Sequence, residues 1–178
     1  MDASLVTLII GFTTVLASGV TSSIVTYRLN RNRSQVIFLR EKAEQLYLSA
    51  DEFGKAFGSQ MLTYFPLLDG KIDFNGMLDM QIEQGSAPRK YGGAETMTML
   101  VEIYFPSVRP ALEEVWKART GFNQVTADIK RAWERTGDVT HGDWRARFLS
   151  ATQVIDNSIN KLQREIVIAA RTHAGVKQ

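Results

Sequence analysis

The sequence predicts an all-α protein, in which a single N-terminal transmembrane helix continues into a cytoplasmic bundle of four to five helices. Three observations predict this class. Residues 3–27 contain no Asp, Glu, Lys or Arg, apolar residues repeat every three or four positions through most of the remaining chain, and no alternating strand pattern appears. We therefore expect an anchor (1–27), a basic juxtamembrane segment (28–35), a helical bundle (36–173) and a C-terminal tail (174–178).

The uncharged stretch is long enough to span a bilayer, because roughly 20 helical residues cross the hydrocarbon core. A cleaved signal peptide would need a basic start and a small-residue cleavage site, and neither is present. Arg28, Arg31 and Arg33 follow the stretch. The positive-inside rule then places the N-terminus outside and the C-terminus in the cytoplasm. We expect a single-pass protein of the inner (plasma) membrane whose three arginines contact anionic lipid headgroups.

The small and polar residues of the anchor follow one heptad seam. Membrane helices associate through small residues and weak polar contacts, so such a seam is a candidate interface between copies of the chain. The alternative is that the Ser and Thr hydroxyls bond to carbonyls of their own helix. A ring of such helices would also line a narrow pore. The seam residues are Ser4, Thr7, Gly11, Thr14, Ser18, Thr21 and Val25.

After the anchor, the three-and-four spacing predicts a succession of helices. An apolar stripe runs from Val36 to Phe57, and a short helix follows that contains Met77 and begins at Asp73 or Asn75. Residues 85–88 read as a loop. The sequence thus predicts two helices and a break before the second half of the bundle.

The second half of the bundle is predicted to contain three further helices. The first covers about 91–104 and stops before Pro106, because the residue before proline is unfavourable in a helix. The second covers about 107–135 with Pro110 in its first turn, where proline is tolerated. A turn with two glycines then leads into the last helix, whose apolar stripe runs from Phe148 to Ala170.

Composition excludes several kinds of chemistry. The chain has no cysteine and two histidines, which excludes disulfides and thiolate sites and argues against a multi-histidine metal site. We therefore expect no metal and no cofactor. The formal net charge is +2, and the basic residues of the C-terminal half are interspersed with acids. Nucleic-acid binding is therefore not indicated by charge.

One short string carries the pattern of a catalytic pair. Arg135 and His141 are separated by five residues at the entry to a helix in an all-α protein, an R-x5-H arrangement. This pattern resembles the R-x4-6-H motif of HEPN ribonucleases. The resemblance implies that Arg135 and His141 would act together on a phosphate of RNA. A membrane-anchored helical protein with such a motif also resembles accessory pore proteins of RNA-targeting CRISPR systems. The alternative is an ordinary interhelical turn.

Arg119 falls on the expected apolar face of its helix, between Val115 and Phe122. A charge on such a face needs a partner or a route to water. The sequence therefore predicts a buried ion pair with Glu95 or Glu102, an arginine whose stem covers apolar surface while its guanidinium reaches water, or a site for a phosphate-bearing ligand.

These observations favour a membrane-anchored helical bundle without catalytic activity that self-associates. It would act as a membrane effector or as a scaffold that recruits an unidentified cytoplasmic protein. Two alternatives stay open: a HEPN-like membrane-anchored ribonuclease or accessory pore protein, and a tethered sensor of a nucleotide or small ligand. The expected partners are the lipid bilayer, further copies of the chain and the cytoplasmic protein.

Overall fold

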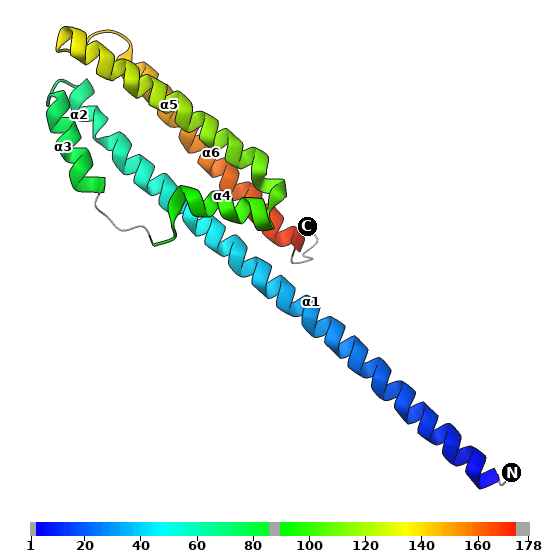
Figure 1. The fold of residues 1–178 in the computed structure, drawn as a ribbon. Helices are drawn as coiled ribbons and strands as arrows, with labels where there is room; N and C mark the ends of the chain where they lie inside the picture. Colours follow the sequence, from blue (N-terminus) through cyan, green and yellow to red (C-terminus); the bar gives the residue numbers. More distant parts are fainter. Residues whose placement is uncertain (1–2, 86–89, 174–178) are drawn as a thin grey trace. The chain divides into compact units, whose positions relative to one another are not determined.

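The computed structural model describes the backbone of residues 3–85 and 90–173 and the side chains of residues 33–85 and 90–172. Within these residues the chain forms six α-helices, one 3-10 turn and no strand (Figure 1), so the all-α prediction is confirmed. By its backbone contacts the chain divides into two compact units, Met1–Arg40 and Glu41–Gln178.

The first unit contains the beginning of α1 (Ala3–Leu62). The side chains of the predicted anchor and seam, and those of Arg28 and Arg31, lie outside the described residues, as does the predicted tail at 174–178. Arg33 and Arg40 are described and exposed, and Ile37 and Phe38 between them are also exposed. Among the described residues, no helix combines the length and the apolar character needed to cross a membrane.

The second unit is built on an antiparallel pair of long helices, α5 (Arg109–Thr136) and α6 (Trp144–His173), which lie side by side (Figure 1). Pro110 lies in the first turn of α5, as predicted. The helix ends at Gly137, whose φ of +66° lets its N–H bond to the Trp133 carbonyl at 2.7 Å. Only glycine adopts this conformation without steric cost, which is why α5 ends there.

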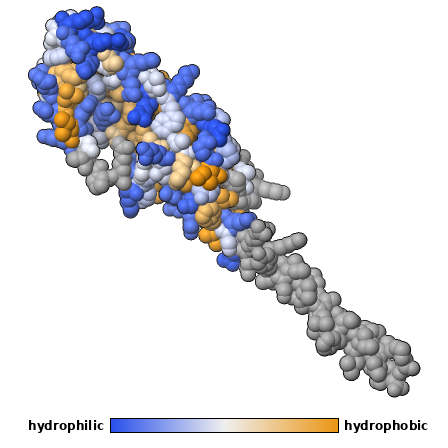
Figure 2. Space-filling view, in the orientation of Figure 1, coloured by the Kyte–Doolittle hydropathy of each residue, from blue (hydrophilic) through white to orange (hydrophobic). Residues whose placement is uncertain are grey.

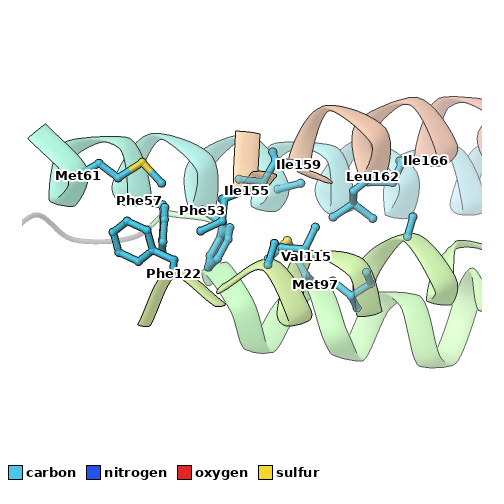
Figure 3. Packing of buried hydrophobic residues seen from close by; sticks show 14 of the residues in the cluster. Phe53, Phe57, Met61, Met97, Val115, Phe122, Ile155, Ile159, Leu162 and Ile166 are labelled. Carbon is cyan, nitrogen blue, oxygen red and sulfur yellow. The ribbon is translucent and has the colours of Figure 1, made fainter. Parts of the chain in front are cut away.

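The later part of α1 packs against this pair through aromatic and aliphatic side chains. Phe53 meets Trp116 edge-on at 5.5 Å between ring centroids, and Phe57 meets Phe122 at 4.8 Å. Figure 3 shows Phe57 beside the ring of Phe122, while the aliphatic side chains of α6 continue the core in the direction of Leu162 and Ile166. The three-and-four spacing predicted this stripe correctly from Ala43 to Phe57, whereas Val36 and Leu39, at its predicted start, are half-buried. Its buried members on α1 are Ala43, Leu46, Ala50, Phe53, Phe57 and Met61.

Two short helices close the end of the unit beyond α1. The first, α2 (Tyr64–Leu68), was not predicted. The second, α3 (Phe74–Gly85), is the predicted short helix, and Asp73 accepts a 2.8 Å hydrogen bond from the backbone N–H of Gly76. The amide of Gln81 donates to the hydroxyl of Thr63 at 3.1 Å, which holds α3 against the end of α1.

The helix α4 (Gly93–Tyr104) is attached to α1 by polar contacts at its start. The buried hydroxyl of Ser49 donates to the Tyr91 carbonyl at 2.8 Å. The carboxylate of Glu52 accepts from the backbone N–H of Lys90 at 2.6 Å and of Tyr91 at 3.0 Å. Phe105 follows α4, and the 3-10 turn η1 (Pro106–Val108) leads into α5.

Candidate functional site

The Arg135 and His141 side chains are placed by the end of α5 and by the turn that follows it. Arg135 Nε donates to the Arg131 carbonyl at 3.2 Å, within α5. His141 is 93% exposed and its Nε2 lies 3.6 Å from Oδ2 of Asp138. The Thr140 backbone N–H donates to Asp138 at 2.7 Å and lowers the pKa of that carboxyl. Each residue is therefore engaged with its own local backbone or turn, and no described cavity is lined by both.

A shallow cavity of about 520 Å³ lies beside Arg135, between α5 and the first turn of α6. The carboxylate of Asp128, which lines this cavity, accepts from Arg131 and, at 2.7 Å, from Arg147. These two guanidinium groups, Arg131 first, hold the pKa of the Asp128 carboxyl below its usual range. The guanidinium of Arg147 also lies 4.8 Å from the Trp144 ring centroid. This arrangement ties α5 to α6.

Arg119 is exposed on α5, so the predicted buried ion pair at this residue is wrong. Ala118 takes the buried position beside it, and Glu102 pairs instead with Arg109. The reason is geometric: positions 118 and 119 both fit the three-and-four spacing between Val115 and Phe122, and the small apolar residue occupies the interior. A ligand role for Arg119 stays a prediction.

An open groove of about 720 Å³ runs between α5 and α6. The groove exists because several of the residues that face it from both helices are small, and their side chains are too short to fill the space between the helices. Ion pairs border the groove, with Lys161 Nζ 2.6 Å from Glu114 on one side. The apolar residues that line this α5/α6 groove are Ala118, Gly121, Phe122, Val125, Ala146, Ala151 and Val154.

A second open groove, of about 570 Å³, lies between α1 and α6. Gly54 and Gly58 face it from α1. A methyl group at Gly54 would lie 3.4 Å from Cγ2 of Ile159, whereas one at Gly58 would meet nothing within 4 Å. Leu62, 61% exposed, and Leu149 line the same groove. The missing side chains at the two glycines therefore open an apolar depression in the helical surface. Figure 2 shows one face of the unit, on which hydrophobic side chains lie among hydrophilic ones.

Sequence reasoning did not find either groove. The available signal was the placement of small residues one helical turn apart, Gly54 with Gly58 on α1 and Ala118 with Gly121 on α5. Such spacing marks a helix surface that another element can approach closely. In the anchor the same kind of spacing predicts the seam, whose side chains lie outside those that the structure describes.

The described part of the chain contains no group of three or more His, Asp or Glu side chains placed to hold a metal ion. The chain matches no protein-family model, no curated protein and no solved structure.

Proposed function

We propose that this chain is a single-pass, membrane-anchored helical bundle that self-associates and acts as a membrane effector or as a scaffold for a cytoplasmic protein. One observation carries the proposal: residues 3–27 contain no charged residue, and Arg28, Arg31 and Arg33 follow them directly. A helix of this length and composition partitions into a bilayer rather than water. The basic flank keeps the following residues on the cytoplasmic side of the inner (plasma) membrane.

Self-association is proposed to occur through the seam of the anchor. Lipid tails are as apolar as leucine, so membrane helices gain little from burying large aliphatic side chains against each other. Gly11, Thr14 and Ser18 are small enough to let two helix backbones approach, and the hydroxyls of Thr14 and Ser18 can bond across the interface. The opposite surface, which contains Phe12 and Leu16, would face lipid.

The recruiting role is proposed for the second unit. The α5/α6 groove is open, apolar and bordered by charged side chains, the features of a surface that takes the apolar face of an amphipathic helix. This supports a scaffold, because a groove of this kind can bind a protein segment without catalysing a reaction. The positions of Arg135 and His141 give no specific support to the nuclease alternative.

The proposal is tested by the mass of the full-length protein in detergent, measured by light scattering. We expect a defined oligomer that is lost when Gly11, Thr14 and Ser18 are replaced by leucine. The matched control replaces Phe12 by leucine and Leu16 by isoleucine on the opposite surface, and it should leave the oligomer intact. A truncated chain that starts at Ser34 should be monomeric.

Two results would overturn parts of the proposal separately. If the full-length protein is extracted from membranes by alkaline carbonate, the anchor is wrong. If the protein stays in the membrane but is monomeric with and without the seam substitutions, self-association is wrong and a simple tether is left.

A further inference from the structure

A third groove, of about 630 Å³, lies near the C-terminal end of α6 and differs from the other two in its charge. Its wall on α1 is Tyr47, and its wall on α6 runs from Asn157 to Arg171. We call it the arginine groove, after Arg164 and Arg171, the two charged residues that line it. No Asp or Glu is among its lining residues, so its electrostatic character is positive.

The two arginines of this groove differ from most others in the second unit. Arg109, Arg131, Arg145 and Arg147 each form an ion pair with a carboxylate. Among the described residues, no ion pair involves Arg164 or Arg171. Two uncompensated guanidinium groups therefore project from one face of α6, two helical turns apart, and both can donate to an anion.

Exposed apolar side chains lie between the two arginines. Val167 is 36% exposed, Ile168 is 44% exposed, and Tyr47 across the groove is 38% exposed. A helix face that combines arginine with aliphatic and aromatic side chains is typical of segments that lie at a membrane surface. The aliphatic groups reach toward the acyl chains while the guanidinium groups contact phosphate.

The position of the groove within the second unit agrees with this chemistry. α1 and α6 are antiparallel: Tyr47 shares a groove with Arg164, Gly54 lies beside Ile159, and Leu62 shares a groove with Leu149. The C-terminal end of α6 therefore lies at the end of the unit where the chain enters it, at Glu41. The anchor precedes this point in the sequence, and residues 28–40 extend only about 20 Å as a helix.

We propose that the arginine groove docks on the anionic headgroups of the bilayer that holds the anchor. The inference rests on the proposed membrane anchoring and adds a second contact with lipid, separate from Arg28, Arg31 and Arg33. Charge complementarity favours this occupant, because the cytoplasmic leaflet is anionic and the groove has no acidic lining. Anchoring also raises the local concentration of headgroups at this surface, so individually weak contacts suffice.

The absence of native cysteine allows a direct test in the full-length protein. A fluorophore is attached at Ile168→Cys, and as the matched control at Leu149→Cys, which is equally exposed at 44% near the other end of α6. Each protein is reconstituted into vesicles of phosphatidylcholine alone or of equimolar phosphatidylcholine and phosphatidylglycerol. Both vesicles carry a headgroup-linked quencher, and fluorescence loss reports approach to the membrane surface.

We expect quenching at position 168 in the anionic vesicles, and little at position 149 or in phosphatidylcholine alone. Replacing Arg164 and Arg171 by glutamine should abolish it, as should high salt, which screens exposed charge. The control replaces Arg119 and Arg135 by glutamine, two exposed arginines elsewhere in the unit, and should leave the quenching unchanged.

Three results would overturn the inference: no quenching at position 168 in anionic vesicles, equal quenching in both vesicles, or a fluorescence change that depends on protein concentration and not on lipid charge. The last would assign the groove to a second copy of the chain. Flotation of every sample with neutral vesicles separates the two proposals. A protein that fails to float contradicts the anchor itself, whereas one that floats without quenching contradicts only the docking of the groove.

Discussion

Arg147 Nη2 lies 2.7 Å from Oδ2 of Asp128, so that α6 is joined to α5 by an ion pair near the turn between the two helices. Arg131, on α5 itself, donates to the other carboxylate oxygen. One carboxylate thus serves both the helix that carries it and the helix packed against it.

This arrangement predicts a pH-dependent contribution to stability. The two arginines lower the pKa of Asp128 in the folded protein, so its contribution is present above the unfolded pKa and is lost as the pH falls through the folded pKa. Asp128→Asn should therefore lower the melting temperature at neutral pH, and the difference from wild type should shrink in acid. Asp79→Asn, an exposed carboxylate on α3, is the control. An equal difference at both pH values would contradict the ion-pair explanation.

The aromatic contacts between α1, α5 and α6 should dominate the stability of the second unit. Phe122 is 1% exposed and lies within ring contact of Phe57, Tyr64 and Phe148. Removing a buried phenylalanine ring costs about 3–5 kcal/mol, from lost burial and the cavity left behind. We expect Phe122→Ala to reduce the free energy of unfolding in urea by this amount. Ile82→Ala, at a 72% exposed residue, should change it by less than about 0.5 kcal/mol.

Two glycines, one within α5 and one at its end, should respond to alanine in opposite directions. Gly137 has φ of +66°, where a Cβ is strained, and Gly137→Ala is expected to destabilise the protein by about 1 kcal/mol. Gly121 lies within the helix with nothing within 4 Å of an added methyl group, so Gly121→Ala should stabilise by about 0.5–1 kcal/mol. The melting temperatures of both variants, compared with that of the wild type, measure the two effects. A shift of the same sign in both would refute the conformational argument.

The contacts of Ser49 and Glu52 should determine how firmly the start of α4 is held. Ser49→Ala leaves the Tyr91 carbonyl without its 2.8 Å donor, and loss of a buried hydrogen bond costs about 1–3 kcal/mol. Glu52→Ala removes the acceptor for two backbone N–H groups. Hydrogen exchange of the amides of α4 should accelerate in both variants. Because both residues hold the same segment, the double variant should show less than the sum of the two effects.

Much of the fold was predictable from spacing alone, because the helices that form the core repeat their apolar residues every three or four positions. Asp73, one of the two residues predicted to begin α3, precedes that helix and accepts the Gly76 N–H, and Pro110 lies in the first turn of α5 as predicted; both follow from local chemistry that does not depend on the tertiary structure. The helix α2 was missed because five residues are too few to show a period, and because it contains Pro66.

The candidate sites were harder to predict, because a groove depends on which helix faces which. The three-and-four spacing correctly predicted a buried position between Val115 and Phe122. Ala118 and Arg119 fit that spacing equally well, and the sequence does not show which of the two adjacent residues faces the core. The R-x5-H pattern from Arg135 to His141 could be found in the sequence, but the positions of the two side chains could not be predicted from it. They depend on the intervening turn, in which Asp138 contacts both Thr140 and His141. The arginine groove requires the antiparallel pairing of α1 with α6, which no local pattern reveals.

The order of helices along the chain has a consequence for synthesis. The apolar stripe of α1, which includes Phe53 and Phe57, is made before the helices that cover it, since its partners α5 and α6 end at Thr136 and His173. At synthesis rates of about 5–20 residues per second, the stripe waits roughly 5–20 s for its full set of partners. The α5/α6 pair, whose helices are made in succession, has no comparable delay. During biosynthesis, aggregation and chaperone binding are therefore expected to begin at α1.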